Sequence, residues 1–161
     1  MAVDMFIKID GIKGEAQDSK HKDEIDVLAW SWGMSQSGTT HMGSGGGSGK
    51  VNVQDISFTK YIDSSSNALM LTCCTGKHIK EATLYVRKAG GENPLEYITI
   101  TMEDIIVSSL STGGSGGEDR LTENVTLNFS KFKYTYTPQD KSGGKGKPMD
   151  ATWNIARNAT S

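Results

Sequence analysis

The chain has 161 residues, of which 35% are hydrophobic, and this size predicts one compact domain spanning residues 1–161. Its 17 basic and 19 acidic residues give a formal net charge of −2, which gives no electrostatic reason to expect nucleic acid or an anionic membrane surface as a partner. The longest uninterrupted apolar runs, 27–30 and 68–71, are far shorter than the roughly 20 residues that cross a bilayer, so we expect no membrane insertion.

The N-terminus and the cysteines both indicate a cytosolic chain. Asp4 precedes a short apolar run over residues 5–7, whereas a secretory signal has a positively charged start and a longer apolar stretch. Export would therefore need a dedicated machine. Cys73 and Cys74 are neighbours in the sequence, and a bridge between them would tie no distant elements together, so we expect reduced thiols.

Apolar and polar residues alternate along most of the chain, and this period of two predicts β-strands. The predicted strands span residues 3–9, 25–35, 82–88, 95–102, 105–111, 121–129 and 149–155. The alternation changes phase around Asp55 and again between Phe129 and Phe132. Such changes predict β-bulges or the corners of a barrel.

The strand predicted over residues 25–35 has two unlike faces. The large side chains on one face are expected in the core, and they belong to Leu28, Trp30, Trp32 and Met34. The other face is small and uncharged, and it consists of Ala29, Ser31, Gly33 and Ser35. A surface strand or a covered sheet would explain this face. We favour a face that lines a channel or contacts another subunit, because ordinary exposed strands carry more charge.

A single helix is predicted after residue 63. Ser64, Ser65 and Ser66 offer N-cap side chains, the apolar run 68–71 follows, and Gly76 is suited to the left-handed C-terminal position. Many strands and one short helix predict a mainly β fold, a sandwich or small barrel with the helix packed on one side.

Glycines mark the loops of the predicted fold. Twelve of the 19 glycines fall within residues 43–49, 113–117 and 143–146, and these stretches are expected to be mobile loops. Gly90 and Gly91 separate two predicted strands and are typical of a hairpin turn.

Catalytic and metal-binding motifs do not fit the sequence. Residues 43–50 resemble a phosphate-binding loop, but Ser44 stands where glycine is required and Val51 replaces the magnesium-binding hydroxyl. Ser115 lies in a G-x-S-x-G spacing, but a strand is predicted after it, whereas a nucleophile elbow leads into a helix. The three histidines have no metal-ligand spacing. We therefore predict no catalytic, cofactor or metal site.

Two alternative functions remain open at this stage. A monomeric β-sandwich that binds carbohydrate would need Trp30, Trp32 or Trp153 exposed, although their places in alternating strands favour the core. A hydrolase would use Ser115 as its nucleophile.

Several segments together carry a resemblance to a known family. They are VLAWSWGMSQSG from Val27, KVNVQDISFTKYID from Lys50, RKAGGENPLEYITI from Arg87 and STGGSGGEDRLTENVTLNF from Ser111. The chain resembles the haemolysin-coregulated protein (Hcp) family, from the opening AVDMFIKI to the closing WNIARN. The resemblance is weakest from Tyr136 to Met149, and the role of the segment 137–148 is not predicted.

The resemblance implies a two-sheet β-barrel with a flanking helix, and a structural rather than an enzymatic function. Six copies would form a ring, and rings would stack into the inner tube of a bacterial type VI secretion system. The implied partners are the spike protein, the contractile sheath, the baseplate and small effectors carried in the ring lumen. The protein would be cytoplasmic before firing and then secreted to the medium or a target cell without a signal peptide.

The resemblance also implies positions for particular residues. Ser31 would point into the lumen and contact effectors. The residues implied near the stacking faces of the ring are Gly43, Ser44, Gly45, Gly46, Gly47, Ser48, Gly49, Gly90 and Arg157. Edge strands of neighbouring barrels are candidates for the contact within a ring, because pairing them satisfies exposed backbone groups.

Overall fold

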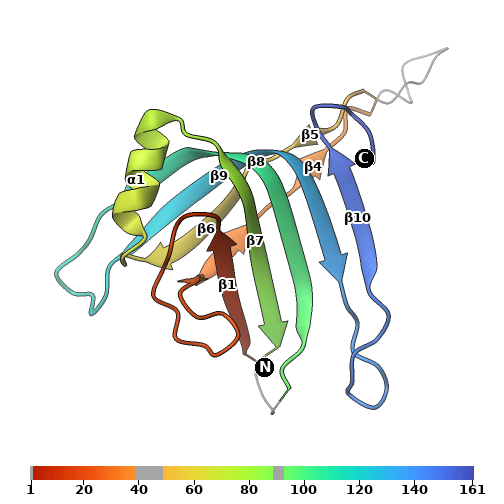
Figure 1. Ribbon diagram of the computed structural model, residues 1–161, viewed down its shortest axis with the longest axis horizontal. Helices are drawn as coiled ribbons and strands as arrows, with labels where there is room; N and C mark the ends of the chain where they lie inside the picture. The colour runs from red at the N-terminus through yellow and green to blue at the C-terminus, as the bar shows by residue number, and fades with distance from the viewer. Residues whose placement is uncertain (1, 39–48, 89–92) are drawn as a thin grey trace.

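The computed structural model describes residues 2–38, 49–88 and 93–161 (Figure 1). One helix and ten strands lie within them, and their bounds are β1 Val3–Ile9, β2 Ile25–Asp26, β3 Ala29–Ser31, β4 Met34–Ser35, β5 Asn52–Val53, β6 Ile56–Tyr61, α1 Ser66–Thr75, β7 Ile79–Lys88, β8 Glu96–Thr112, β9 Thr122–Tyr136 and β10 Met149–Asn154. Strands 3–9, 82–88 and 149–155 are thus confirmed with small differences at their ends, and the strand predicted over 121–129 is confirmed but continues to residue 136.

Eight of the strands form one curled antiparallel sheet. Its order is β2-β1-β7-β8-β9-β6-β3, with β10 pairing β9, while β4 and β5 make a second, two-stranded sheet. The two end strands, β2 and β3, are joined by Val27 and Leu28, whose N–H groups donate to Met5 O at 2.9 Å and Thr59 O at 2.8 Å. The predicted mainly β fold with two sheets and one helix is confirmed, and the large sheet is an open half-barrel.

The concave side of the curled sheet holds the hydrophobic core. Alternate residues of each long strand point into it, as expected for a sheet with one covered face. Helix α1 packs against β8 (Figure 1), and its Leu69 is fully buried. The central core residues are Ile7, Ile9, Ile25, Ile56, Phe58, Leu69, Leu84, Val86, Ile100, Met102, Ile105, Val107, Val125, Leu127, Phe129 and Phe132.

The predicted change of phase between Phe129 and Phe132 is a corner of the sheet. Both phenylalanines are buried in β9, and they pair with the buried Ile105 and Met102 of β8. Between these two buried residues Asp104 has a left-handed φ of 55°, which turns the strand without ending it. The two strands predicted over residues 95–102 and 105–111 are therefore one strand, β8.

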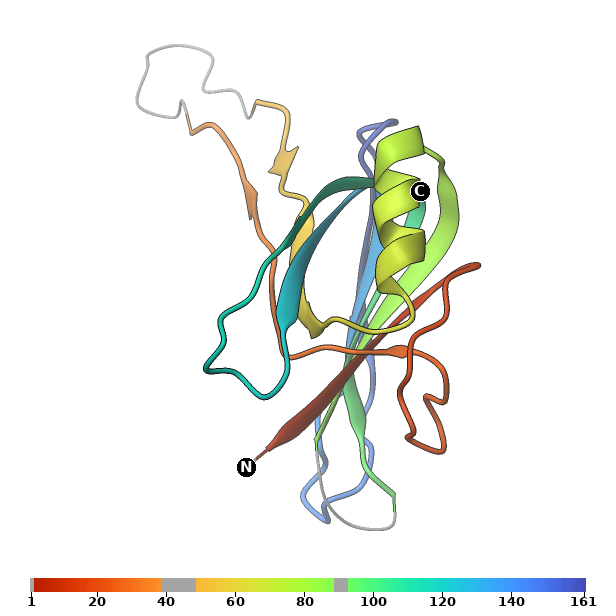
Figure 2. The same ribbon diagram turned by 90° about the vertical axis from the view of Figure 1, so that its left-hand side faces the viewer.

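The other change of phase, around Asp55, separates two sheets. β5 ends at Val53 and pairs with β4, whereas β6 begins at Ile56 and pairs with β3 and β9. The β4–β5 arm projects from the body of the molecule (Figure 2). The side chains on either side of Asp55 thus point in opposite directions because they belong to different sheets.

The prediction of a single strand over residues 25–35 is wrong. The segment forms three short strands, which pair in turn with β1, β6 and β5. Trp30 and Trp32 pack partly buried against the core as predicted, but Leu28 and Met34 are 39% and 48% exposed. Because the segment changes its neighbour twice, no single face can be buried along it.

Helix α1 begins and ends near the predicted residues. Gly76 has a φ of 67°, and its N–H donates to Thr72 O at 3.1 Å, which confirms the predicted C-terminal position. Ser65 occupies the N-cap without a side-chain cap, and its N–H donates instead to Asp63 Oδ1 at 2.9 Å. Cys73 and Cys74 lie on this helix and are not bridged. In the described ranges, no helix is long and apolar enough to cross a membrane.

A buried ion pair joins β6, β9 and the start of α1. Lys60 Nζ lies 2.5 Å from Glu123 Oε1 and 3.0 Å from Asp63 Oδ1, and the three side chains are 0%, 1% and 8% exposed. Ser66 Oγ donates to the same Glu123 oxygen at 2.6 Å, and Lys60 Nζ also donates to Tyr61 O. The Lys60 ammonium is therefore shared by two carboxylates, and all three charged groups are hydrogen-bonded within the protein, as buried charges require.

Lys60→Met is expected to lower the free energy of unfolding by about 3–5 kcal/mol, because it leaves the Glu123 carboxylate buried without a cation. Urea unfolding measures the loss. The matched control is Lys131→Met, which removes an exposed pair with Glu103 at 3.7 Å and should cost less than about 1 kcal/mol. Equal losses in the two variants would contradict the structural importance of the buried pair.

Candidate functional site

Hydroxyl side chains form a row across the outer face of the curled sheet. The row runs over four strands, because Ser31 of β3 pairs with Ser57 of β6, Ser57 with Thr126 of β9, and Thr126 with Ser109 of β8. Directly opposed residues point to the same side of a sheet. Their strand neighbours on β6 and β9 are buried, so these hydroxyls face outward.

A second row lies beside the first. It consists of Ala29, Thr59, Asn124 and Ser111, again one residue from each of β3, β6, β9 and β8. Thr59 Oγ1 donates to Asn124 Oδ1 at 2.7 Å, and in the first row the Ser57 and Thr126 hydroxyls lie 3.1 Å apart. We call the two rows the serine–threonine face; all eight of its residues are uncharged at neutral pH.

One carboxylate borders the serine–threonine face. Asp55 accepts hydrogen bonds from Ser108 Oγ at 2.7 Å and Asn128 Nδ2 at 2.8 Å. These donors hold the carboxylate against the sheet. The surface as a whole offers short hydroxyl and amide groups that already bond to one another and can also bond to water or a partner, with little electrostatic preference for the charge of that partner.

The structure places the sequence-predicted residues in separate regions. Ser31 is exposed at the edge of the serine–threonine face, and its place in the lumen stays a prediction. Arg157 is exposed after β10, where its N–H donates to Asn154 Oδ1 at 3.0 Å. Gly49 and Asn158 line one cavity of about 420 Å³, so Gly49 lies near Arg157. The predicted positions outside the described residues are Gly43, Ser44, Gly45, Gly46, Gly47, Ser48 and Gly90.

Gly49 and Arg157, the predicted stacking residues that the structure describes, lie at one end of the molecule. The C-terminus lies at this end, where β4 and β5 leave the body, whereas β7 ends and β8 begins at the other end (Figure 1). Lys88 N donates to Leu95 O at 3.0 Å, which confirms the predicted antiparallel connection although its turn, residues 89–92, is not described. The segment 137–148 lies at this same end and joins β9 to β10 (Figure 1).

The alternative functions find little support in this geometry. Ser115 lies in the connection from β8 to β9, so a strand follows it, as the sequence predicted, and not the helix of a nucleophile elbow. Trp30, Trp32 and Trp153 pack against the core and offer no fully exposed ring to a sugar. Among the described residues, no group of three or more His, Cys, Asp or Glu side chains is arranged to hold a metal ion.

The serine–threonine face was only partly predicted from sequence. The sequence indicated Ser31, because this residue lies on the small, uncharged face of the segment 25–35 and because the family resemblance implies that it points into the lumen. The hydroxyls of β6, β8 and β9 were missed, although Ser57 and Thr59 alternate with buried Ile56 and Phe58. That alternation was the available signal, but which strands lie beside β3 cannot be read from it.

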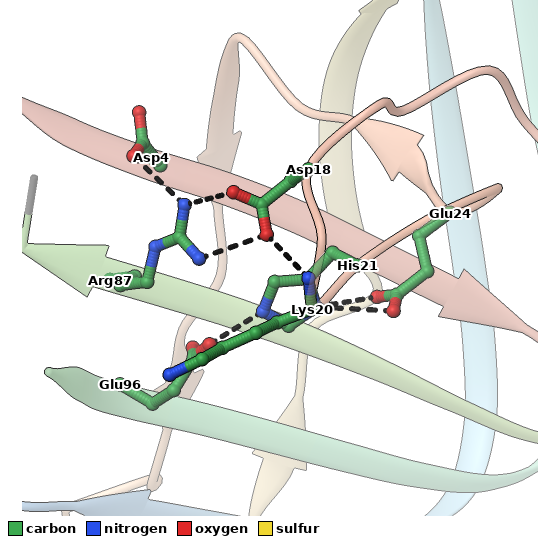
Figure 3. Close-up of polar contacts among 7 residues, drawn as sticks. All are labelled: Asp4, Asp18, Lys20, His21, Glu24, Arg87 and Glu96. Carbon is green, nitrogen blue, oxygen red and sulfur yellow. Dashed lines mark hydrogen bonds and ion pairs between the residues drawn. The ribbon is translucent and has the colours of Figure 1, made fainter. Parts of the chain in front are cut away.

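A second polar cluster lies where residues 10–24, which we call the strap, cross β1 and β7 (Figure 3). The buried His21 ring stacks on Phe6 at 4.5 Å and lies 4.7 Å from the Tyr85 ring. Its Nδ1 contacts Glu24 at 3.0 and 3.1 Å, and its Nε2 contacts Glu96 Oε1 of β8 at 2.5 Å. Both ring nitrogens therefore face carboxylates.

Arg87 makes the second attachment of the strap (Figure 3). This buried guanidinium donates to Asp18 at 2.6 and 3.1 Å and to Asp4 at 3.1 Å. Its hydrogen bonds hold the pKa of Asp18 well below the usual range, and Asp18 in return raises the pKa of Arg87. Both groups are consequently charged across the physiological range.

The chain is similar in sequence and in structure to type VI secretion proteins. Residues 6–136 match the family model described as the type VI secretion system effector Hcp. The chain is 64% identical over 159 residues to protein hcp1 of Pseudomonas aeruginosa, with 98% of each chain covered. It is similar to the crystal structure of Hcp1 from Salmonella typhimurium, at 44% identity and a TM-score of 0.84 with 100% of each chain covered. A type VI secretion system effector from Yersinia pestis gives 38% identity and a TM-score of 0.76, covering 94% of this chain and 99% of that one.

Asp18→Asn is expected to lower the free energy of unfolding at neutral pH by about 1 kcal/mol, since the partly exposed pair with Arg87 is screened by solvent. Because the folded pKa of Asp18 lies below its unfolded value, its contribution is complete above about pH 4 and is lost as the pH falls further. Unfolding in urea between about pH 3 and pH 7 should therefore show a shallower acid loss in the variant. An unchanged pH profile would contradict this, and Asp119→Asn in the exposed β8–β9 loop is the control.

Proposed function

The chain belongs to the Hcp family of type VI secretion system effectors. Because of this membership, we propose that it is a structural subunit of the secretion tube. Six copies form a ring, rings stack into a tube, and the serine–threonine face lines the lumen. The observation that carries this proposal is that face, an outward-facing surface of eight uncharged residues on four adjacent strands, five of them exposed and three half-buried. The function lies in the assembly and not in catalysis.

Ring closure needs two different patches that meet head to tail. Within the described part of the chain, β3 pairs only with β6 and β10 pairs only with β9, so each leaves one edge open. These are different edges of one molecule, which suits a head-to-tail contact and not a two-fold one. Pairing or covering them in a ring would satisfy their exposed backbone groups.

Stacking uses the two ends of the molecule. The end with Gly49 and Arg157 and the end with the β7–β8 connection lie far apart along the strands (Figure 1), so one ring can present both to its neighbours. A head-to-tail stack of this kind grows without closing and gives a tube. In a firing apparatus, the further partners are the spike protein, the contractile sheath and the baseplate.

The chemistry of the serine–threonine face suits a carrier lumen. Hydroxyl and amide groups bond to water nearly as well as to a protein partner, so small effectors would be held by many weak contacts and released when the ring opens. The low charge admits effectors of either net charge. The protein is cytoplasmic before firing and reaches the medium or the target cell together with its cargo.

The native mass of the purified protein tests the ring. Mass spectrometry under native conditions should show six copies, and electron microscopy of the same sample should show rings that stack at high concentration. A monomer at high concentration would contradict the proposal and favour the binding-module alternative. Rings that do not stack would support the proposed ring and contradict the proposed tube.

Ser31→Gln is expected to preserve rings but to reduce the recovery of co-purifying small proteins at least about fivefold, because a longer side chain intrudes on the cargo surface. Mass spectrometry of material purified from the producing cells measures this. Ser19→Gln, an exposed serine on the strap, is the matched control and should leave recovery unchanged. Loss of rings in Ser31→Gln would place Ser31 in a subunit interface instead.

A further inference from the structure

We propose that His21 is a proton-dependent clamp that fixes the end of the strap to the start of β8, beside the β7–β8 connection. The inference rests on the contacts of His21 alone and is independent of the tube. Glu96, the partner on β8, lies opposite Arg87 of β7 in the sheet register, next to the irregularity between Val86 and Arg87. The clamp therefore joins the strap to β8 beside the register irregularity of the β7–β8 pairing.

The chemistry of imidazole makes the clamp depend on a proton. Carboxylates accept hydrogen bonds, a neutral imidazole donates from one ring nitrogen, and an imidazolium donates from both. In the structure Nδ1 faces Glu24 and Nε2 faces Glu96. Both contacts are hydrogen bonds only when the ring carries its second proton.

Among the described residues, the side-chain hydrogen bonds of Glu24 and Glu96 are those with His21. Glu96 Oε2 and the Nε of Arg87, the residue opposite Glu96 in the sheet, are both buried without a partner. When the ring loses a proton, one carboxylate faces a nitrogen lone pair. His21 is only 5% exposed and the Glu24 side chain 11%, so water cannot readily replace a donor lost from that contact, whereas the Glu96 side chain is 31% exposed.

The pKa values of Asp18, Tyr85 and Arg87 are shifted away from the range between about pH 6 and pH 8.5, where imidazoles commonly titrate. Burial, with the negative charges of Glu24 and Glu96, raises the pKa of Tyr85, so this phenol stays neutral. Asp18 and Arg87 stay paired, as described above. The charged and titratable groups that surround the ring are Asp18, Lys20 and Glu24 of the strap, Asp4 of β1, Tyr85 and Arg87 of β7, and Glu96 of β8.

Loss of the proton should open one end of the strap and not the whole of it. The Asp18–Arg87 contacts still hold the preceding residues. Opening would weaken local backbone hydrogen bonds, namely His21 N to Asp18 O at 3.2 Å, Glu24 N to His21 O at 3.1 Å and Asp23 N to Ala16 O at 2.9 Å. The amides of His21, Asp23 and Glu24 thus report on the clamp.

Hydrogen exchange of the full-length protein tests the clamp. Between about pH 6 and pH 8.5, after correction for the intrinsic exchange rate, protection of the His21, Asp23 and Glu24 amides should fall at least about tenfold while the core of β8 is unchanged. His78→Gln is the matched control: His78 pairs with Asp104 at 2.8 Å, but the two side chains are 61% and 60% exposed. This variant should keep the full response. Equal corrected protection at both pH values, or a response lost in His78→Gln, would overturn the proposal.

A variant of Glu96 and the protonation state of the His21 ring test the clamp independently of the hydrogen exchange of the wild-type protein. Glu96→Gln removes one charge but keeps an acceptor, so it should fold and should reduce the pH response; an undiminished response would overturn the clamp. Nitrogen NMR of the wild-type ring at about pH 6 should show both His21 nitrogens protonated. A neutral ring at that pH, with the strap still protected, would equally overturn it.

Discussion

The hydrogen bonds that Val27 and Leu28 donate to Met5 and Thr59 hold the two ends of the curled sheet together. Because β2 and β3 are consecutive in the chain, this short bridge fixes the distance between β1 and β6, and with it the curl of the strands between them. The curl encloses the core on its concave side. It also forces the polar residues of β3, β6, β9 and β8 outward, which is what assembles the serine–threonine face.

Charged side chains attach the remaining parts to this sheet in two ways. Lys60 and Glu123 are buried against each other, and Ser66 donates to Glu123, so this pair fixes the start of α1. The strap is held by Asp18 on Arg87 and by His21 between two glutamates. Carboxylate–guanidinium contacts keep their charge over a wide pH range, whereas imidazole contacts do not. The same fold thus combines a permanent attachment with one that can respond to protons.

Charge is distributed unevenly over the surface, and this bears on the proposed function. In the described residues, the ion pairs lie around the strap, at the start of α1, at the bend of β8 around residues 103–104 and between β9 and β10, while the serine–threonine face carries none. A lumen with strong charge would select or retain cargo of the opposite sign. A neutral hydroxyl surface does neither, which suits a carrier that must deliver different effectors.

The sequence by itself determined the strand content, the helix with its Gly76 terminus and the membership of the family, because alternation, capping and ordered motifs are local signals. It also indicated Ser31. Only the tertiary structure decided that residues 25–35 change partners twice, that Lys60 meets Glu123, and that His21 meets Glu96. The physical reason is that periodicity tells which side of a strand is covered, whereas strand order and register, which depend on the packing of the whole core, decide what lies beside each residue.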